Sequence, residues 1–182
     1  KIIPFEYTYL VYEPAWESYI YAKDDYMGLI NRKGEIDPVH RYNNLSNLSD
    51  GYAMYAVNDK HGLLNKQLEV VVPAAYDYIL QYNHKYFIIS EDSTSKILSI
   101  ENQEVVLEEF KELYLAGEDN LFIASNDGVL YGYVNAAGET VIPFKYSYAS
   151  PFSDGFALVA LEDSEEFITI NMQGEIIEQT SE

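Results

Sequence analysis

Short stretches of alternating hydrophobic and polar residues run along this chain, and a turn signal follows each of them. The clearest example is residues 131–146, where an alternating strand (132–135) leads into a turn that ends at Gly138. A second strand (139–142) follows and is expected to stop at Pro143. Glycine adopts the positive φ that a tight turn needs, and proline cannot donate a hydrogen bond to a β-ladder. The pattern predicts a β-hairpin.

The same hairpin recurs along the whole chain with a period of about 35 residues, which is typical of repeat proteins. Its first strand begins at positions 28, 62, 96, 132 and 168. Gly28, Gly62 and Gly132 share the first position, and Gly34 and Gly138 share the turn position. These glycines are predicted to serve the geometry of the repeat.

Proline and tyrosine form two further columns of the repeat. An apolar pair followed by proline occurs at 2–4, 71–73 and 141–143, which places Pro73 and Pro143 in one column. Three residues after the proline stands a ring, and the column reads Tyr7, Tyr42, Tyr76, Phe110 and Tyr146. Because they recur at one position, these rings are predicted to pack between units rather than to line a site.

Each unit offers three short strands, and a fourth is possible near the tyrosine column. The strand after the tyrosine lies at 19–22, 52–57, 86–90, 121–125 and 156–161. Residues 108–115 have some helical spacing, but their column is a loop in the other units, so a loop or a single turn is expected there. Strands and turns at this spacing predict an all-β fold.

The units divide the chain into one predicted domain, residues 1–182. Four units span 28–57, 62–90, 96–125 and 132–161, and two half units, 1–23 and 168–182, complement each other. We predict a closed, five-unit, β-propeller-like ring of short antiparallel sheets, in which the last strands pair near residues 1–23 and leave no exposed edge. The alternative is an open β-solenoid.

Composition supports the β prediction and excludes several partners. The chain has 18 Tyr and 8 Phe, and aromatic residues favour strands. Its net charge of −19 argues against binding nucleic acid or an anionic membrane, since neither negative surface would be neutralised. Without cysteine, disulfides and thiolate metal sites are excluded. No apolar run approaches the length of a membrane span.

One family shares these motifs. Residues 132–146 read Gly-Tyr-Val-Asn-x-x-Gly-Glu-x-Val-Ile-Pro-Phe-x-Tyr, and 151–157 read Pro-Phe-Ser-Asp-Gly-Phe-Ala. This sequence resembles the bacterial WG repeat, and the resemblance extends over essentially the whole chain, most faintly at 96–125. The tryptophan of the motif is absent: Tyr131, Met27 and His61 stand in its place. The resemblance implies a β-rich, exported or envelope protein without catalytic residues or cofactors.

Aromatic residues outside the repeated column are the candidate binding residues. One cluster comprises Tyr9, Tyr12, Trp16 and Tyr19, and further candidates are Tyr78, Tyr82, Tyr148 and Phe152. Rings provide contact area at a low entropic cost, so loop rings on one side of a propeller could stack on a sugar or a peptide.

Acidic turns recur after the same strand of each unit. The candidates are Asp24, Asp25, Glu91, Asp92, Glu162 and Asp163. In a ring they would share one face and could attract a basic partner. The simpler interpretation is that polar residues suit turns.

No pattern identifies a reaction or a metal. His40, His61 and His84 fall in different columns and lack ligand-like spacing, and there is no nucleophile elbow. We therefore predict a non-enzymatic module that binds protein or glycan. The alternatives are a structural spacer and, third, a carboxylate-dependent glycosidase.

Overall fold

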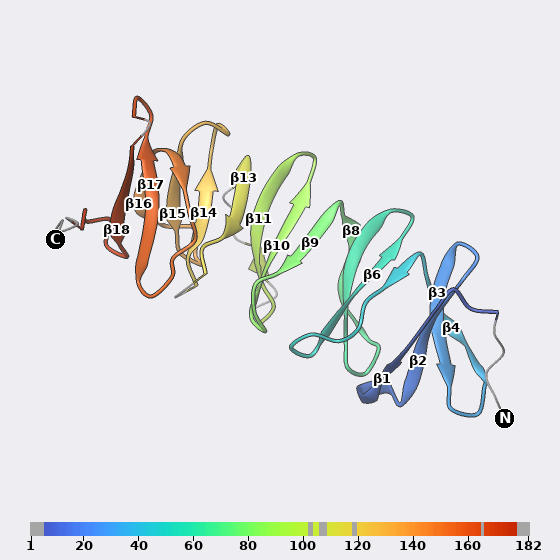
Figure 1. Ribbon diagram of the computed structural model, residues 1–182. Helices are drawn as coiled ribbons and strands as arrows, with labels where there is room; N and C mark the ends of the chain where they lie inside the picture. Colours follow the sequence, from blue (N-terminus) through green and yellow to red (C-terminus); the bar gives the residue numbers. More distant parts are fainter. Residues whose placement is uncertain (1–5, 102–103, 106–108, 118–119, 165, 178–182) are drawn as a thin grey trace. The chain divides into compact units, whose positions relative to one another are not determined.

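The computed structural model describes residues 6–101, 104–105, 109–117, 120–164 and 166–177 as four antiparallel sheets (Figure 1). The first sheet contains β1 (Tyr9–Glu13), β2 (Ser18–Lys23), β3 (Tyr26–Asn31) and β4 (Ile36–Tyr42), with a 3₁₀ turn, η1 (Pro14–Trp16), between β1 and β2. The second contains β5 (Asn44–Leu45), β6 (Tyr52–Val57), β7 (Lys60–Asn65) and β8 (Val70–Tyr76). The third contains β9 (Tyr78–Gln81), β10 (Tyr86–Glu91), β11 (Thr94–Ser99) and β12 (Glu104–Val105). The last contains β13 (Glu112–Leu115), β14 (Phe122–Ser125), β15 (Tyr131–Val134), β16 (Thr140–Ala149), β17 (Phe156–Leu161) and β18 (Phe167–Asn171).

The predicted all-β repeat class is confirmed, and the first strand of the hairpin is present in each copy, as β3, β7, β11, β15 and β18. The expected strand end at residues 2–4 lies outside the described residues, and the second strand of the last hairpin is reduced to a single bridge at Ile176. The possible fourth strand is also present, as β1, β5 and β9. The expectation of a loop at 108–115 was wrong where the structure describes a strand there, because β13 pairs with β14 from Glu112↔Ser125 to Leu115↔Phe122. Pairing with a neighbouring strand overrides the local helical spacing.

The chain divides into two compact units, residues 1–79 and 80–182, and each is described by itself. Neighbouring repeats are joined tightly, because only Asn43 separates β4 from β5 and only Asp77 separates β8 from β9. In the last sheet, β16 runs without a break through the same position, Ser147, which makes that sheet six-stranded.

Pairing at the end of the last sheet is local. β18 pairs with β17 on one side, and Ile176 and Ile177 pair with it on the other. Among the described residues no strand of 166–177 pairs with the first sheet, so ring closure and a single domain stay predictions. The described residues include no helix long and apolar enough to cross a membrane.

A side-chain clasp closes the hairpin turn of the repeat. Asn135 accepts hydrogen bonds from the N–H groups of Ala137 and Glu139 at 2.9 and 3.0 Å, and its Nδ2 donates to the Glu139 carboxylate at 2.8 Å. Asn31, Asn65 and Asn171 repeat these bonds. The turn ends in a left-handed residue, Gly138 at φ 80°.

Gly132 is required by the close approach of β16. A Cβ at this position would lie 2.5 Å from the Ile142 carbonyl oxygen, and at Gly62 it would lie 2.5 Å from the Val72 carbonyl oxygen. The approach occurs at a bulge, where the pairing register shifts between Tyr131 and Tyr133.

The bulge also corrects the interpretation of the prolines. Pro143 and Pro73 do not end their strands, because β16 continues to Ala149 and β8 to Tyr76. A bulged residue is left out of the ladder, so a proline without an N–H is tolerated there.

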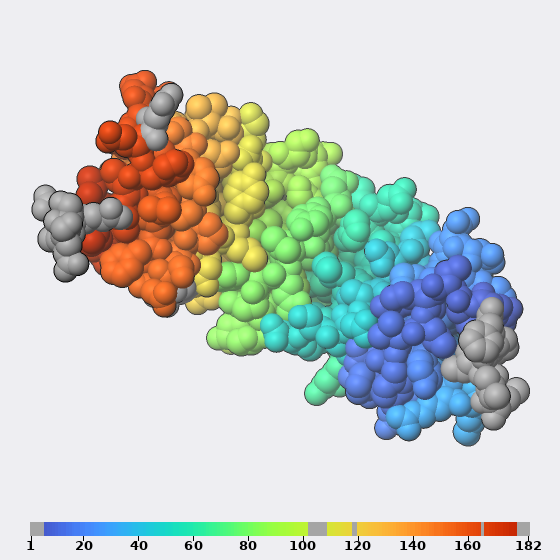
Figure 2. Space-filling view, in the orientation of Figure 1, coloured from blue at the N-terminus to red at the C-terminus, as the bar shows by residue number. Residues whose placement is uncertain are grey.

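The core lies between sheet faces. In the first unit, Ile20 and Leu29 of the first sheet pack with Ala53 and Leu64 of the second. In every sheet, we call the face equivalent to that of Ile20 and Leu29 in the first sheet the front face. The opposite face is the rear face, and in the second sheet it carries Ala53 and Leu64. Within each unit, side chains fill the space between the sheets (Figure 2).

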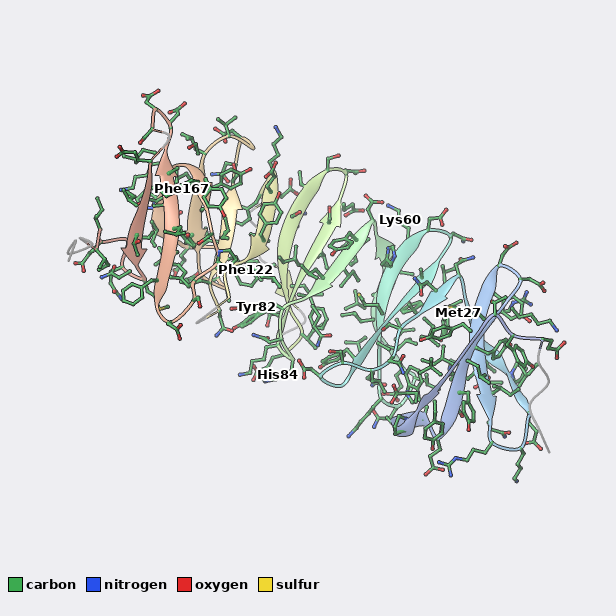
Figure 3. All side chains as sticks on the ribbon, in the orientation of Figure 1. Met27, Lys60, Tyr82, His84, Phe122 and Phe167 are labelled. Atoms are coloured by element: carbon green, nitrogen blue, oxygen red, sulfur yellow. The ribbon has the colours of Figure 1, made fainter. Side chains whose placement is uncertain are left out.

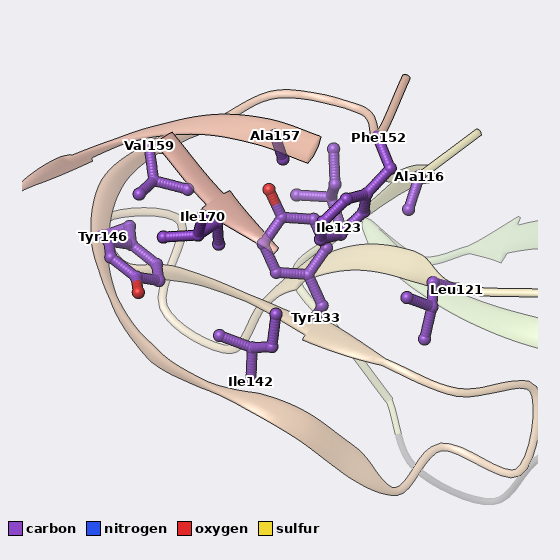
Figure 4. Close-up of a cluster of buried hydrophobic side chains, with 10 residues drawn as sticks. All are labelled: Ala116, Leu121, Ile123, Tyr133, Ile142, Tyr146, Phe152, Ala157, Val159 and Ile170. Carbon is purple, nitrogen blue, oxygen red and sulfur yellow. The ribbon is translucent and has the colours of Figure 1, made fainter. Parts of the chain in front are cut away.

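The second unit repeats this packing. Ile88 and Ile97 on the front face of the third sheet pack with Phe122 and Val134. Within the last sheet, ten buried residues form one cluster (Figure 4): Ala116, Leu121, Ile123, Tyr133, Ile142, Tyr146, Phe152, Ala157, Val159 and Ile170. The buried Tyr146 agrees with the predicted packing role of its column, whereas Tyr42 and Tyr76 are half-buried.

We predict that Gly132→Ala destabilises the protein by about 1–3 kcal/mol, since the added methyl forces β15 and β16 apart. Equilibrium denaturation measures the change. Ala137→Ser, at an exposed position of the same turn, should remain within about 0.5 kcal/mol of wild type. Equal stability of Gly132→Ala and wild type would contradict the close approach.

Candidate interaction surface

The rear face of the first sheet carries an unusual concentration of tyrosine. Register pairs Leu10 with Tyr21 and Tyr12 with Tyr19, and cross-strand partners share a face. Tyr26 lies on the same face two residues before Gly28, the partner of Tyr21. Leu10 is 41% exposed, whereas Tyr12, Tyr19 and Tyr26 are half-buried. We call this surface the tyrosine face.

The rings of the tyrosine face contact one another. Ring centroids lie 4.8 Å apart for Tyr7 and Tyr21, 5.1 Å for Tyr12 and Tyr19, and 6.0 Å for Tyr21 and Tyr26. Burial, followed by the hydrogen bond with Tyr26, raises the pKa of Tyr21 to about 12. The Tyr21 hydroxyl is therefore uncharged near neutral pH.

Two exposed arginines cover rings at this face. The Arg41 guanidinium carbon lies 3.5 Å from the Tyr26 ring centroid, and that of Arg32 lies 4.7 Å from the Tyr12 centroid. Arg32 also donates a hydrogen bond to the Tyr12 hydroxyl. Cation–π contacts of this kind hold a guanidinium flat on a ring, so positive charge is presented over an aromatic surface.

Glu13 fixes the chain between β1 and β2. Its carboxylate, 6% exposed, accepts hydrogen bonds from the Ala15 N–H, the Asn47 amide and the Leu48 N–H, each at 3.1 Å. Trp16 donates from its indole N–H to the Lys66 carbonyl at 3.1 Å. The turn that joins Tyr12 to Tyr19 is thereby held against the second sheet.

A second apolar surface lies on β17 and β18, on the front face of the last strands. Phe156 and Leu158 are each 47% exposed and Phe167 is 60% exposed. Phe167, labelled in Figure 3, meets Tyr148 edge to face with centroids 5.3 Å apart. We call this surface the phenylalanine face.

Comparison with known proteins explains the repeat. The family described as "WG containing repeat" matches residues 62–94 and 131–163. These two stretches are similar to the WG repeat. No curated protein matches the chain.

Solved structures share the fold of these repeats. Hsv2 of Kluyveromyces lactis, a β-propeller-like protein, is 10% identical with a TM-score of 0.50, and the match covers 93% of this chain and 62% of that one. A eukaryotic initiation factor is 11% identical with a TM-score of 0.54, over 97% of this chain and 55% of that one. The chain thus spans less than two thirds of these structures, which show the fold alone.

The tryptophan position of the WG repeat is filled differently in each copy. Met27, labelled in Figure 3, packs in the first unit's core and accepts the Leu45 N–H at its sulfur. Tyr131 donates to the Glu112 carboxylate at 2.6 Å, which raises the pKa of Tyr131 to about 12. The buried Nδ1 of His61 has no hydrogen-bond partner among the described residues. Phe167 takes this position in the last copy.

The structure brings only part of the predicted aromatic cluster together. Tyr12 and Tyr19 stack, but Trp16 packs toward the core between the first two sheets. Tyr9, on the opposite face, is 40% exposed and donates weakly to Asn47 at 3.4 Å. Among the other candidates, Tyr78 and Tyr148 are exposed.

Two other ring candidates lie in or against the core. Phe152 is 4% exposed and stacks on Tyr133 at 4.8 Å, so its assignment as a binding ring was wrong. Ala157, on β17, belongs to the same buried cluster as Phe152. Tyr82 is half-buried and packs on Phe122 at 5.0 Å.

The acidic turns are exposed where predicted. Asp24 and Asp25 join β2 to β3, Glu91 ends β10 and Asp92 follows it, and Glu162 and Asp163 follow β17. Asp24 and Asp92 have φ of 54° and 50°, a left-handed geometry that aspartate tolerates. That all of these acidic turns share one face of the molecule stays a prediction.

Asp24 and Asp25 also line a hollow of about 400 Å³ with Tyr26 and Arg41. The described residues form no group of three His, Asp or Glu that could hold a metal ion. The hollow therefore presents negative and positive side chains beside the Tyr26 ring, and it extends the tyrosine face.

Sequence reasoning missed Glu13, Arg32 and Arg41. Glu13 directly precedes Pro14, and a side-chain acceptor before a proline is a signal for the start of a helical turn, so it could have been found. The two arginines could not have been found in this way, because the tyrosine rings that they contact lie on other strands.

Glu13→Ala should destabilise the protein by about 1–3 kcal/mol, because buried donors lose their acceptor. Burial alone would raise the pKa of Glu13, but its three hydrogen bonds outweigh burial and lower that pKa. The stabilisation is therefore complete above the unfolded-state pKa of about 4.3 and is lost as pH falls through the lower folded-state pKa.

The matched variant is Glu13→Gln, which keeps the shape but has one acceptor oxygen. Denaturation at several pH values should show a constant stability gap to wild type near neutral pH and a shrinking gap in acid. A gap that does not change with pH would contradict the carboxylate's role.

Proposed function

We propose that this protein is a non-enzymatic interaction module whose tyrosine face binds a protein segment with acidic and apolar side chains. The observation that carries the proposal is the pairing of exposed Arg32 and Arg41 with the rings of Tyr12 and Tyr26. Tyrosine and arginine are the residues most enriched at energetically important interface positions. Exposed Leu10 adds apolar area beside them.

Arg32 and Arg41 bring positive charge to this face although the whole chain is acidic. Asp24 and Asp25 lie beside Arg41, so the charge that favours an acidic partner is that of Arg32. A carboxylate reaching Arg32 would bind a guanidinium whose ring contact already fixes its plane, so little side-chain entropy is lost on binding.

The experiment is a peptide array probed with the purified protein. Peptides that combine Asp or Glu with Leu or Phe should bind, and versions with Lys in place of the acids should not. Arg32→Ala should weaken binding about tenfold, as expected for truncation of an interface arginine.

Lys33→Ala is the matched control, because it removes the same charge from an exposed neighbour and leaves the ring contact intact. The proposal is wrong if Arg32→Ala and Lys33→Ala bind the array as wild type does. It is equally wrong if the protein binds no peptide on the array but binds a glycan array, with the same affinity for wild type and Arg32→Ala.

A further inference from the structure

We propose that a hollow in the last sheet is an aromatic cage that binds an organic cation, specifically a trimethylammonium group. The hollow lies on strands β13 to β16 (Figure 1), which do not contribute to the tyrosine face, so the inference goes beyond the proposed function. It follows from the rings that line the hollow, from the carboxylate that two of them bind, and from the equivalent place in the second sheet.

Three tyrosine rings line this hollow, which has a volume of about 250 Å³. Its lining residues are Tyr114, Ile123, Tyr131, Ser147, Tyr148 and Ala149. Tyr114 and Tyr148 are 50% and 47% exposed, so a ligand can reach their rings. The volume is below the roughly 300–1,000 Å³ of pockets for drug-sized ligands, which suits a single small group. We call this hollow the aromatic cage.

A carboxylate holds two of the three rings. Oε2 of Glu112 accepts hydrogen bonds from the hydroxyls of Tyr131 at 2.6 Å and Tyr114 at 2.9 Å. The first of these bonds raises the pKa of Tyr131 to about 12, so this ring stays uncharged near neutral pH. Because both rings are held before a ligand arrives, little side-chain entropy is lost on binding.

Charge at the aromatic cage favours a cation. Glu112 brings negative charge to two of its rings, and none of the lining residues is basic. The two lysines nearest in sequence make other contacts. Lys111 donates to the Asp127 carbonyl oxygen at 2.8 Å, and Lys145 lies 5.1 Å from the Tyr146 ring centroid. Tyrosine faces attract cations, and a nearby carboxylate strengthens that attraction.

The hydrogen-bonding groups favour a methylated ammonium over a primary one. A primary ammonium has three N–H donors that need acceptors. Oε2 of Glu112 already accepts two hydroxyls, and the Ser147 hydroxyl donates to the Leu161 carbonyl oxygen at 3.1 Å. A trimethylammonium group has no N–H to satisfy, and aromatic rings recognise it through its charge and its methyl groups.

The second sheet has a hollow in the equivalent place, with a volume of about 120 Å³. His61 stands there in place of Tyr131, since each directly precedes the glycine that begins a repeat. Tyr78 stands in place of Tyr148, at the same separation from that glycine.

Strand pairing extends the comparison to the first strand of each sheet. By register, Asn44 and Ser46 take the places of Glu112 and Tyr114, and both line the smaller hollow. The repeat therefore forms a hollow in both sheets, but only the one in the last sheet combines three tyrosine rings with a carboxylate. The residues that distinguish the two hollows are those that would recognise a cation.

The test is an NMR titration of the full chain with choline, which follows the resonances of the tyrosine rings. The control ligand is the neutral analogue of choline in which carbon replaces the ammonium nitrogen, because it keeps the shape and lacks the charge. Choline should bind at least about tenfold more tightly than this analogue. Ethanolamine, which carries a primary ammonium, should also bind more weakly than choline.

Variants locate the site. Tyr114→Leu should weaken choline binding about tenfold, because one ring is lost, whereas Tyr114→Phe should stay within about threefold of wild type. Glu112→Gln keeps the shape but removes the charge, and it should weaken binding about tenfold. Tyr78→Leu is the matched control, since it removes the equivalent of Tyr148 from the second sheet, and it should bind choline as wild type does. Thermal unfolding of each variant checks that it is folded.

A peptide that carries trimethyllysine identifies the source of the group. If the peptide binds more tightly than choline, and its lysine version does not bind, the ligand is a methylated protein. If the peptide binds no more tightly than choline, the ligand is a small molecule. Both results support the aromatic cage, since the trimethylammonium group is common to them.

The inference is wrong if choline binds no more tightly than its neutral analogue, or if Tyr114→Leu and Tyr78→Leu bind choline equally well. It is also wrong if a glycan binds with the same dependence on Tyr114 while choline does not bind. Arg32 does not line the aromatic cage, so Arg32→Ala should bind choline as wild type does. Failure of the choline titration therefore leaves the proposed function standing.

Discussion

Burial of both faces of a small sheet is the constraint on which this structure depends. A sheet with apolar residues on both sides needs a cover on each side, and the repeat supplies it from the next unit along the chain. Ile20 and Leu29 are buried only because Ala53 and Leu64 lie against them. Stability in such arrays is a sum of contacts between neighbours. The strands must therefore be apolar, while the turns are free to carry the net charge of −19.

The hairpins could be predicted from sequence because their chemistry is local. Asn135 bonds to residues within its own turn, and Gly138 provides the left-handed position of that turn. Pro143 was misread because the bulge that accommodates it depends on Gly132, on the neighbouring strand. Strand β13 was missed for the same reason, since its pairing partner β14 lies beyond a loop. Local signals do not encode such pairings.

The candidate site was predictable only where its residues are neighbours across one turn. Tyr12 and Tyr19 were expected together and do stack. Arg32 reaches Tyr12 of β1 from the turn after β3, so no spacing rule brings the two together. Phe152 shows the reverse error, because its aromatic character suits a binding loop equally well and only the packing shows it to be core. Exposure of a ring is decided by whether a sheet covers it, which residue type does not reveal.

The substituted tryptophan position makes a different contact in different copies of the repeat. Met27 uses its sulfur to accept the Leu45 N–H, while Tyr131 uses its hydroxyl to bind Glu112. These contacts need different partners, so the repeats cannot exchange places without leaving a polar group unsatisfied. His61 already bears that cost at Nδ1, on the order of 1–3 kcal/mol for a buried unpaired group. Polar contacts that differ from copy to copy thus favour the native contacts over other pairings that apolar faces alone would allow.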